Sequence, residues 1–223
     1  MTLLETTPTE ALSVAMRQGS MAEHTEAENA GFTSLLLEGK INELGYLHYL
    51  EALRTVYGAL EKVGRTLLDD AWVGTLHDLR LERGAAIDAD LQYWSERAGV
   101  ELGNVSAAAT GYAERVEAAA ANPLLYVAHH YTRYLGDLSG GLAIGRVLGR
   151  TYEVAPGSAG LAFYEFAEIE KPKVYKDGYR AALDALPLDA EQRTTVVNEV
   201  KVAFGQNQAL FNELGENLAA YQR

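Results

Sequence analysis

Apolar residues recur every three or four positions along most of the chain, which is the spacing of an amphipathic helix. The clearest case is the segment from Glu43 to Leu68. Its apolar positions would share one helix face: Leu44, Leu47, Leu50, Leu53, Val56, Tyr57 and Leu60. No segment alternates strictly between apolar and polar residues with β-branched enrichment, as a half-buried strand would. The pattern therefore predicts an all-α protein.

Caps and prolines mark where the predicted helices begin and end. Thr9 is the expected N-cap of the first helix, and each of the five prolines lies where a helix could start or stop. The expected helices cover residues 11–29, 43–68, 85–97, 106–119, 123–152, 171–186 and 190–221, with a loop at 154–160. Because no repeat or linker interrupts them, we expect a single-domain helical bundle over residues 1–223, with about residues 1–8 flexible.

Composition and charge exclude several classes of protein. The chain has 223 residues, of which 48% are hydrophobic, so its apolar content is sufficient for a core. Its 19 basic and 31 acidic side chains give a net charge of -12, which does not attract nucleic acids or anionic lipids. The absence of cysteine excludes disulfides, Cys-ligated zinc, iron–sulfur clusters and thiolate nucleophiles.

The apolar runs and the N-terminus favour a cytoplasmic location. The longest uncharged run, residues 118–132, is too short and too polar to span a bilayer. The acidic N-terminus lacks the basic start and apolar stretch of a signal peptide. We therefore expect a cytoplasmic protein with no membrane or nucleic-acid partner. Nothing in the sequence demands an oligomer, so we expect a monomer.

One predicted helix is unusually rich in glycine. Between Tyr131 and Arg150 it contains five glycines, which together disfavour the helix by roughly 4–5 kcal/mol relative to alanine. Gly136 and Gly140 lie four residues apart and therefore share a face. A bare face of this kind allows either close packing of another helix or the approach of a flat ligand to the backbone. The sequence alone leaves both interpretations open.

A histidine in the first predicted helix supplies a candidate metal ligand. His24 is followed one turn later by Glu28, and a metal-bound histidine usually donates its second ring N–H to a carboxylate or carbonyl. The alternative is an ordinary surface pair that contributes only tenths of a kcal/mol. An axial histidine and a bare glycine face together would suit haem. The haem propionates would need local cations, for which the candidates are Arg17, Lys173, Lys176 and Arg180.

These segments resemble the haem oxygenase family, and most closely its soluble bacterial members. The segment YTRYLGDLSGG is similar to that family's distal helix, and HTEAENAGF is similar to its proximal helix. KVYKDGYR resembles the propionate-binding helix, and VAFGQNQALFNEL resembles the last helix. The resemblance is thin between residues 72 and 123. Two departures are Leu142, where a glutamine is common, and Arg17, where lysine also occurs in the family.

The resemblance implies a role for each candidate residue. It makes His24 the axial ligand of the haem iron, with Glu28 holding its ring. It places Gly136 and Gly140 against the distal haem face, and Asp137 in a water network with Tyr57, Arg133 and Asn207. The residues that it implies for haem binding are Arg17, His24, Glu28, Tyr131, Lys176, Arg180 and Phe204. The implied fold is a haem sandwiched between a proximal helix and a kinked distal helix.

The implied activity is the opening of the haem ring at the α-meso carbon, with O₂ and electrons, to give biliverdin, carbon monoxide and ferrous iron. Haem b would then be both cofactor and substrate. Electrons would come from an external reductase or a ferredoxin-type donor, because the chain has no flavin or nicotinamide fingerprint. Two alternatives remain open: a carrier that releases haem intact, and a helical domain whose glycines serve packing alone. The purpose, iron release or pigment supply, is also open, although we expect iron release.

Overall fold

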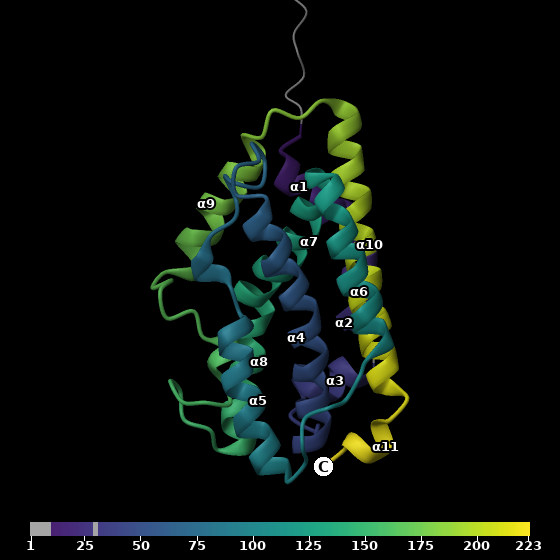
Figure 1. The fold of residues 1–223 in the computed structure, drawn as a ribbon, viewed down its shortest axis with the longest axis vertical. Coiled ribbons are helices and arrows are strands. Elements are labelled where there is room, and N and C mark those ends of the chain that lie inside the picture. Colours follow the sequence, from purple (N-terminus) through teal and green to yellow (C-terminus); the bar gives the residue numbers. More distant parts are fainter. Residues whose placement is uncertain (1–9, 29–30) are drawn as a thin grey trace, which may run out of the picture.

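The computed structural model describes residues 10–28 and 31–223 and is helical throughout (Figure 1). Its α-helices are α1 (Leu12–Gly19), α2 (Met21–Glu28), α3 (Gly31–Leu37), α4 (Glu43–Thr66), α5 (Gly84–Ala98), α6 (Ala107–Ala118), α7 (Pro123–Gly136), α8 (Leu142–Tyr152), α9 (Pro172–Asp184), α10 (Ala190–Gly215) and α11 (Leu218–Tyr221). In these ranges the β-structure is limited to an isolated bridge between Ile41 and Gln222. The prediction of an all-α fold is confirmed.

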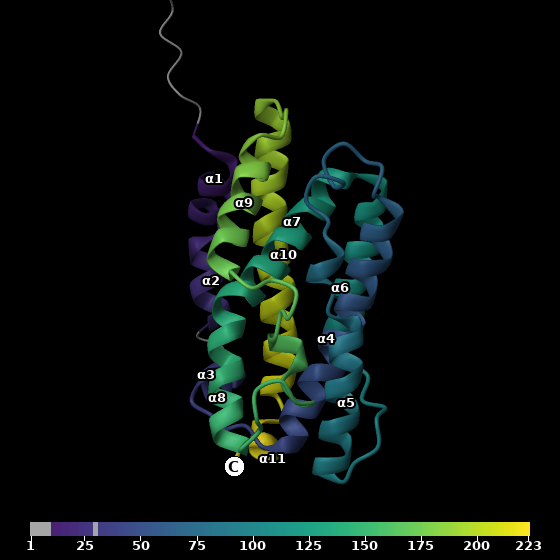
Figure 2. The same ribbon diagram turned by 90° about the vertical axis from the view of Figure 1, so that its left-hand side faces the viewer.

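The helices form a bundle around α4, α7 and α10. Figure 2 shows α4, α5 and α6 on one side and α1, α2, α8 and α9 on the other, with α7 and α10 between them. The core is unusually rich in tyrosine. The largest side chains with less than 2% exposure include Trp94, Tyr46, Tyr57, Tyr112, Tyr126 and Tyr134. Burial of such large aromatic surfaces is the main favourable contribution to folding.

The expected helix over residues 11–29 is wrong in one respect, because it consists of two helices. Ser20 separates α1 from α2 with backbone angles of φ -113° and ψ 15°, outside the helical region. Its hydroxyl donates to the carbonyl of Met16 at 2.8 Å, a local bond that competes with the helical ladder. The expected N-cap Thr9, and the expected flexibility of residues 1–8, lie outside the described residues.

The structure adds a short helix that the sequence pattern missed. Helix α3 has only seven residues, which is too short for a periodicity of 3.6 to be recognised. At the other end, the expected helix 190–221 is interrupted after Gly215, and α11 turns back toward the start of α4. The side chain of Asn42 donates to the carbonyl of Ala220 at 2.7 Å, which fixes the last residues against this end of the bundle.

Helices α7 and α8 continue one another through a π-helical turn, Asp137–Gly141. Pro123 begins α7 at a position where its missing N–H is not needed. The loop after α8 is held by the buried carboxylate of Asp90, which accepts hydrogen bonds from the backbone of Gly160, Ala162 and Phe163 at 2.7–3.0 Å. This anchor fixes the adjacent Tyr164 against α8. In the described ranges no helix combines the length and the apolar stretch that crossing a membrane requires.

Candidate functional site

Four buried polar side chains from three helices and the π-turn form one hydrogen-bonded network. Arg133 donates to the side-chain carbonyl of Asn207 at 2.7 Å and to the hydroxyl of Tyr57 at 2.9 Å. The Tyr57 hydroxyl in turn donates to the carboxylate of Asp137. Arg133 also lies 3.6 Å from the other carboxylate oxygen of Asp137. The structure thus brings together the four residues that the sequence grouped, from positions up to 150 residues apart (207 − 57 = 150).

Opposing electrostatic effects act on the pKa of the Asp137 carboxylate in this network. Burial raises the pKa of Asp137, whereas the charge of Arg133, the hydrogen bond from Tyr57 and the charge of Arg83 lower it. The net shift of the pKa is upward. A buried carboxylate with a raised pKa is typical of a group that holds or passes a proton.

A cavity of about 140 Å³ lies directly beside this network. It is lined by side chains and backbone from α2, α3, α4, α7, α8, α10 and the loop after α8. The lining residues are His24, Ala27, Thr33, Tyr49, Thr132, Arg133, Gly136, Asp137, Gly140, Gly141, Ile144, Phe163, Tyr164, Phe204, Asn207 and Phe211. The candidate ligand His24, the two glycines and the polar network therefore share one cavity.

The glycines of this helix fall into two groups. A Cβ atom added to Gly136 or Gly140 would meet no atom within 4 Å, so both glycines face open space. A Cβ atom on Gly145 would lie 2.8 Å from the Tyr164 side chain, and one on Gly149 would lie 3.2 Å from Leu161. Helix packing therefore explains the later glycines but not Gly136 and Gly140.

His24 lies on the surface of the cavity at the exposed face of α2. Its ring contacts that of Phe204 edge-on, with 5.3 Å between the ring centroids. Phe204 comes from α10, which packs along α2. Glu28 is the last residue of α2, but its side chain lies outside the described residues, and its pairing with His24 stays a prediction.

Cations gather where α1, α7 and α9 approach each other. Lys176 donates to the hydroxyl of Ser139 at 2.8 Å, which ties α9 to the π-turn. Burial raises the pKa of Tyr131, and the nearby positive charges of Arg180 and Arg17 oppose that rise. Burial, followed by the charge of Arg180, lowers the pKa of Lys176. The structure thus groups Arg17, Tyr131, Lys176 and Arg180 at one edge. Lys173 is an exposed residue of α9 and has no such link within the described part of the chain.

Several cavity residues were not predicted. Tyr49 lies eight residues before Tyr57 on α4, so the helical period could have placed it on the same face. Thr33 comes from α3, the helix that the pattern missed, and its buried hydroxyl has no hydrogen-bond partner among the described residues. Tyr164 comes from a single 3₁₀ turn, Ala162–Tyr164, and no periodicity in the sequence points to it.

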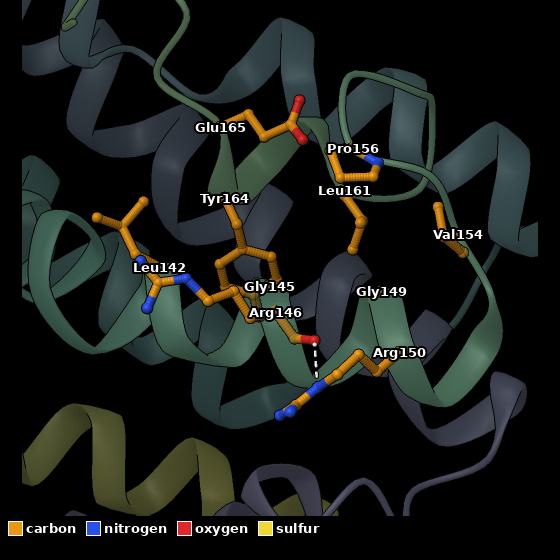
Figure 3. A pocket seen from close by; sticks show the side chains of 10 residues that line it. All are labelled: Leu142, Gly145, Arg146, Gly149, Arg150, Val154, Pro156, Leu161, Tyr164 and Glu165. Carbon is orange, nitrogen blue, oxygen red and sulfur yellow. Dashed lines mark hydrogen bonds between the residues drawn. The ribbon is translucent and has the colours of Figure 1, made fainter.

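A larger cavity of about 550 Å³ lies between α8 and the loop after it, as Figure 3 shows. Its walls are mainly apolar and include Leu142, Leu161 and the ring of Tyr164. Tyr164 lines both cavities and forms a wall between them. Arg146 and Arg150 lie at the edge of the larger cavity, where Arg150 donates to the backbone carbonyl of Arg146 at 3.3 Å. None of the four network residues lines this second cavity.

The residues of the smaller cavity fit haem. Gly136 and Gly140 leave backbone exposed on one wall, and His24 offers an imidazole from another helix. The cationic edge at Arg17, Lys176 and Arg180 suits two carboxylates. Small-molecule sites usually measure about 300–1,000 Å³, so a porphyrin would need more room than the 140 Å³ of this cavity.

Comparisons with known proteins agree in one family. The sequence profile of the heme oxygenase family matches residues 10–213. Heme oxygenase 1 of the cyanobacterium Synechocystis is 36% identical over 208 residues, which cover 93% of this chain and 86% of that protein. Human heme oxygenase 1 is 33% identical over 93% of this chain and 73% of its own length.

Solved structures give the same result. The crystal structure of the Synechocystis heme oxygenase-1 in complex with heme superimposes with a TM-score of 0.86 at 36% identity, covering 94% of this chain and 95% of that chain. The heme oxygenase of Leptospira interrogans superimposes with a TM-score of 0.83 at 31% identity, covering 91% and 99%.

Proposed function

Because the chain belongs to the haem oxygenase family of haem-degrading oxidoreductases, we propose that it opens haem b at the α-meso carbon, using O₂ and external electrons, to give biliverdin, carbon monoxide and ferrous iron. The observation that carries this proposal is the pair Gly136 and Gly140. They face a cavity that no described residue fills, directly beside the buried carboxylate of Asp137.

When bound, haem supplies the iron that activates O₂ and the ring that is oxidised. His24 would hold the iron, with Glu28 as the predicted partner of its imidazole ring. Phe204, in contact with His24, would line the haem on the same wall of the cavity. The bare backbone at Gly136 and Gly140 would allow the haem to lie close to this helix and would restrict the space left beside them.

Asp137 would orient ordered water in the cavity and pass a proton through it. Arg133 and Tyr57 fix the carboxylate on one side, and Asn207 fixes Arg133 by accepting its hydrogen bond. A carboxylate whose pKa is raised by burial can bind and release a proton closer to neutral pH than a solvent-exposed one. Asp137 would in this way supply a proton at a fixed position in the cavity through a bridging water.

The cationic edge would fix the in-plane orientation of the haem ring. Arg17, Lys176 and Arg180 are placed to bind propionates, and a guanidinium can hold a carboxylate with two parallel hydrogen bonds. Tyr131 would add a hydroxyl at the same edge. Fixing the propionates decides which meso carbon faces the restricted space beside Gly136.

The electron donor is a separate reductase or a ferredoxin-type protein in this proposal. Haem degradation for iron release is the purpose that we propose. A monomeric state and a cytoplasmic location stay predictions.

Reconstitution with hemin tests the proposal. We expect the purified protein to bind hemin with a shifted Soret band, and then, with a reductant under air, to lose that band and form a bile pigment. A carrier would keep the Soret band intact under the same conditions. A domain whose glycines serve packing alone would give no Soret shift.

A further inference from the structure

A series of aromatic rings leads from the polar network to α9. The ring centroids of Tyr57 and Tyr134 are 5.8 Å apart, and those of Tyr134 and His130 are 4.6 Å apart. His130 then stacks on Tyr179 at 5.7 Å with ring planes within 3° of parallel. All four side chains are at most 5% exposed. Edge-to-face and stacked contacts at these distances place the rings in van der Waals contact.

The last two rings are also joined by a hydrogen bond. The Tyr179 hydroxyl lies 2.7 Å from Nδ1 of His130. In the tautomer that carries its proton on Nε2, the neutral ring of His130 accepts the O–H of Tyr179 at Nδ1. Burial, followed by the charge of nearby His77, lowers the pKa of His130 to about 3, so the ring is neutral at neutral pH and keeps a lone pair for a strong acid such as an oxidised phenol.

The neighbouring phenols are less favourably placed. The hydroxyl of Tyr134 has no hydrogen-bond partner among the described residues. That of Tyr126 donates to the backbone carbonyl of Leu60, which is a very weak base. Tyr57 donates to the carboxylate of Asp137, but it also accepts hydrogen bonds from Arg133, whose positive charge makes removal of an electron from that ring less favourable. Of these phenols, Tyr179 is the one best placed to lose an electron and a proton together.

We propose that Tyr179 is a redox-active tyrosine that reduces oxidised haem through Tyr134 and Tyr57, while its phenolic proton moves to Nδ1 of His130. The inference rests on the proposed haem-binding function. The oxidant is haem that has been oxidised beyond the ferric state by a peroxide or peracid. One electron leaves Tyr179 for the haem, the O–H bond breaks, and a new N–H bond forms on His130. A one-electron reductant such as ascorbate reverses both transfers.

The physical reason is that an oxidised phenol is a strong acid. In a buried site without water, its proton needs a base within hydrogen-bond distance, or the oxidation is unfavourable. The pair of Tyr179 and His130 meets this need away from the haem cavity. Oxidising equivalents that fail to open the haem ring would then leave the cavity rather than damage its lining.

The chain offers a matched control in a second tyrosine–histidine pair. The hydroxyl of Tyr221 lies 2.7 Å from Nδ1 of His48, the same distance as in the first pair, although the two rings are perpendicular here. The ring of Tyr221 contacts that of Phe32, with 6.3 Å between the centroids. Phe32 in turn contacts the ring of the cavity-lining Tyr49, with 5.8 Å between the centroids. A benzene ring is much harder to oxidise than a phenol, so we expect Tyr221 to remain reduced.

The test is to treat the haem-loaded protein with m-chloroperoxybenzoic acid, freeze it within milliseconds and record its EPR spectrum. We expect a tyrosyl radical with one exchangeable proton coupling that disappears in D₂O. Trapping with a nitroso compound, followed by peptide mass spectrometry, should place the adduct on Tyr179. Tyr179→Phe should remove the signal, Tyr134→Phe should slow its appearance, and Tyr221→Phe should leave it unchanged.

Three results would overturn the proposal: an undiminished signal in Tyr179→Phe, an adduct on Tyr221, or no tyrosyl signal while the Soret band shows bound haem. If Tyr179→Phe does not fold, His130→Gln decides the question, because it keeps the phenol but must change the exchangeable proton coupling. The Soret band reports haem binding separately. A protein without this band has not bound haem, and that result contradicts the proposed function and not the role of Tyr179.

Discussion

At the scale of single residues, glycines of the same helix serve different purposes. Gly145 lies against Tyr164 and permits close packing, whereas Gly140 faces the haem cavity and supports no contact within the chain. Gly140 therefore disfavours the helix by about 1 kcal/mol relative to alanine without a compensating contact. Such a disadvantage is expected where function, rather than folding, selects the residue.

Gly140→Ala should therefore stabilise the haem-free protein and weaken haem binding. We expect its free energy of unfolding to rise by up to about 1 kcal/mol, because the new methyl group meets no atom within 4 Å. Thermal unfolding and hemin titration measure the two effects. Gly145→Ala is the matched control and should lower stability, since its Cβ would lie 2.8 Å from Tyr164. A destabilised Gly140→Ala protein would contradict the assignment.

His24→Ala should leave haem bound weakly and without oxygenase activity. Burial of the haem ring and contacts with the haem propionates remain in this variant, but the proposed iron ligand is lost. Hemin titration followed by single-turnover assays measures both properties, and added imidazole should restore part of the activity. Wild-type turnover without imidazole would show that another histidine binds the iron.

Asp137→Ala should keep the fold and the haem but fail to form biliverdin. Without the carboxylate, the ordered water loses its anchor, and we expect peroxidase-like oxidation of an added dye instead. Asp137→Asn should retain part of the activity, because an amide can still orient water. The measurements are pigment yield and dye oxidation side by side. A fully active Asp137→Ala enzyme would remove this residue from the mechanism.

Much of the polar network could be predicted at this scale because it depends on residue type in recognisable motifs. The grouping of Tyr57, Arg133 and Asn207 around Asp137 came from the family resemblance. Tyr164 and Thr33 could not be found in the same way. One lies on a single 3₁₀ turn held by Asp90, and the other lies on a helix too short to show a period.

At the scale of elements, α9 carries the cations that we expect to orient haem. Lys176→Ala combined with Arg180→Glu should let the ring turn in its plane, so that some biliverdin arises from a different meso position. Loss of one charge-assisted contact weakens binding by on the order of 1–3 kcal/mol, so haem should still bind. Chromatography of the biliverdin isomers from single turnovers measures the outcome. If the double variant forms only the α isomer and binds haem with normal affinity, residues other than Lys176 and Arg180 hold the propionates.

Helix positions followed well from periodicity, whereas their interruptions did not. The expected segments 43–68 and 106–119 differ from α4 and α6 by only one or two residues at either end. The breaks at Ser20 and after Gly215 depend on local hydrogen bonds and on contacts with distant segments. Such tertiary effects leave no periodic signal in the sequence.

At the scale of the whole molecule, a buried ion pair links α6, α7 and α10. The carboxylate of Glu199 lies 2.8 Å from both Arg115 and His129. Burial opposes ionisation of Glu199, but hydrogen bonds from His129 and Arg115 outweigh it and lower its pKa from 4.5 to about 2. The acid is thus more easily ionised in the folded than in the unfolded protein.

This shift predicts a specific acid sensitivity. The contribution of Glu199 to stability is fully present above about pH 4.5 and is lost as the pH falls through about 2. Its pH-dependent part amounts to about 3 kcal/mol. Denaturation at several pH values should therefore show that wild type has a higher free energy of unfolding than Glu199→Gln above pH 4.5. This difference should disappear as the pH falls from 4.5 to 2. A difference in the free energy of unfolding that stays constant with pH would contradict the lowered pKa of Glu199.

The π-turn at Asp137–Gly141 also sets how many residues join α7 to α8. A π-turn holds one residue more than the α-helical turn that it replaces. Deleting one residue there would leave an ordinary α-helical turn that covers the same angle, so α8 would keep its orientation relative to α7. Gly145 and Gly149 would still pack against Tyr164 and Leu161, whereas the residues of the turn that line the cavity would change their places. Such a deletion should thus preserve the packing of α8 and alter the haem cavity.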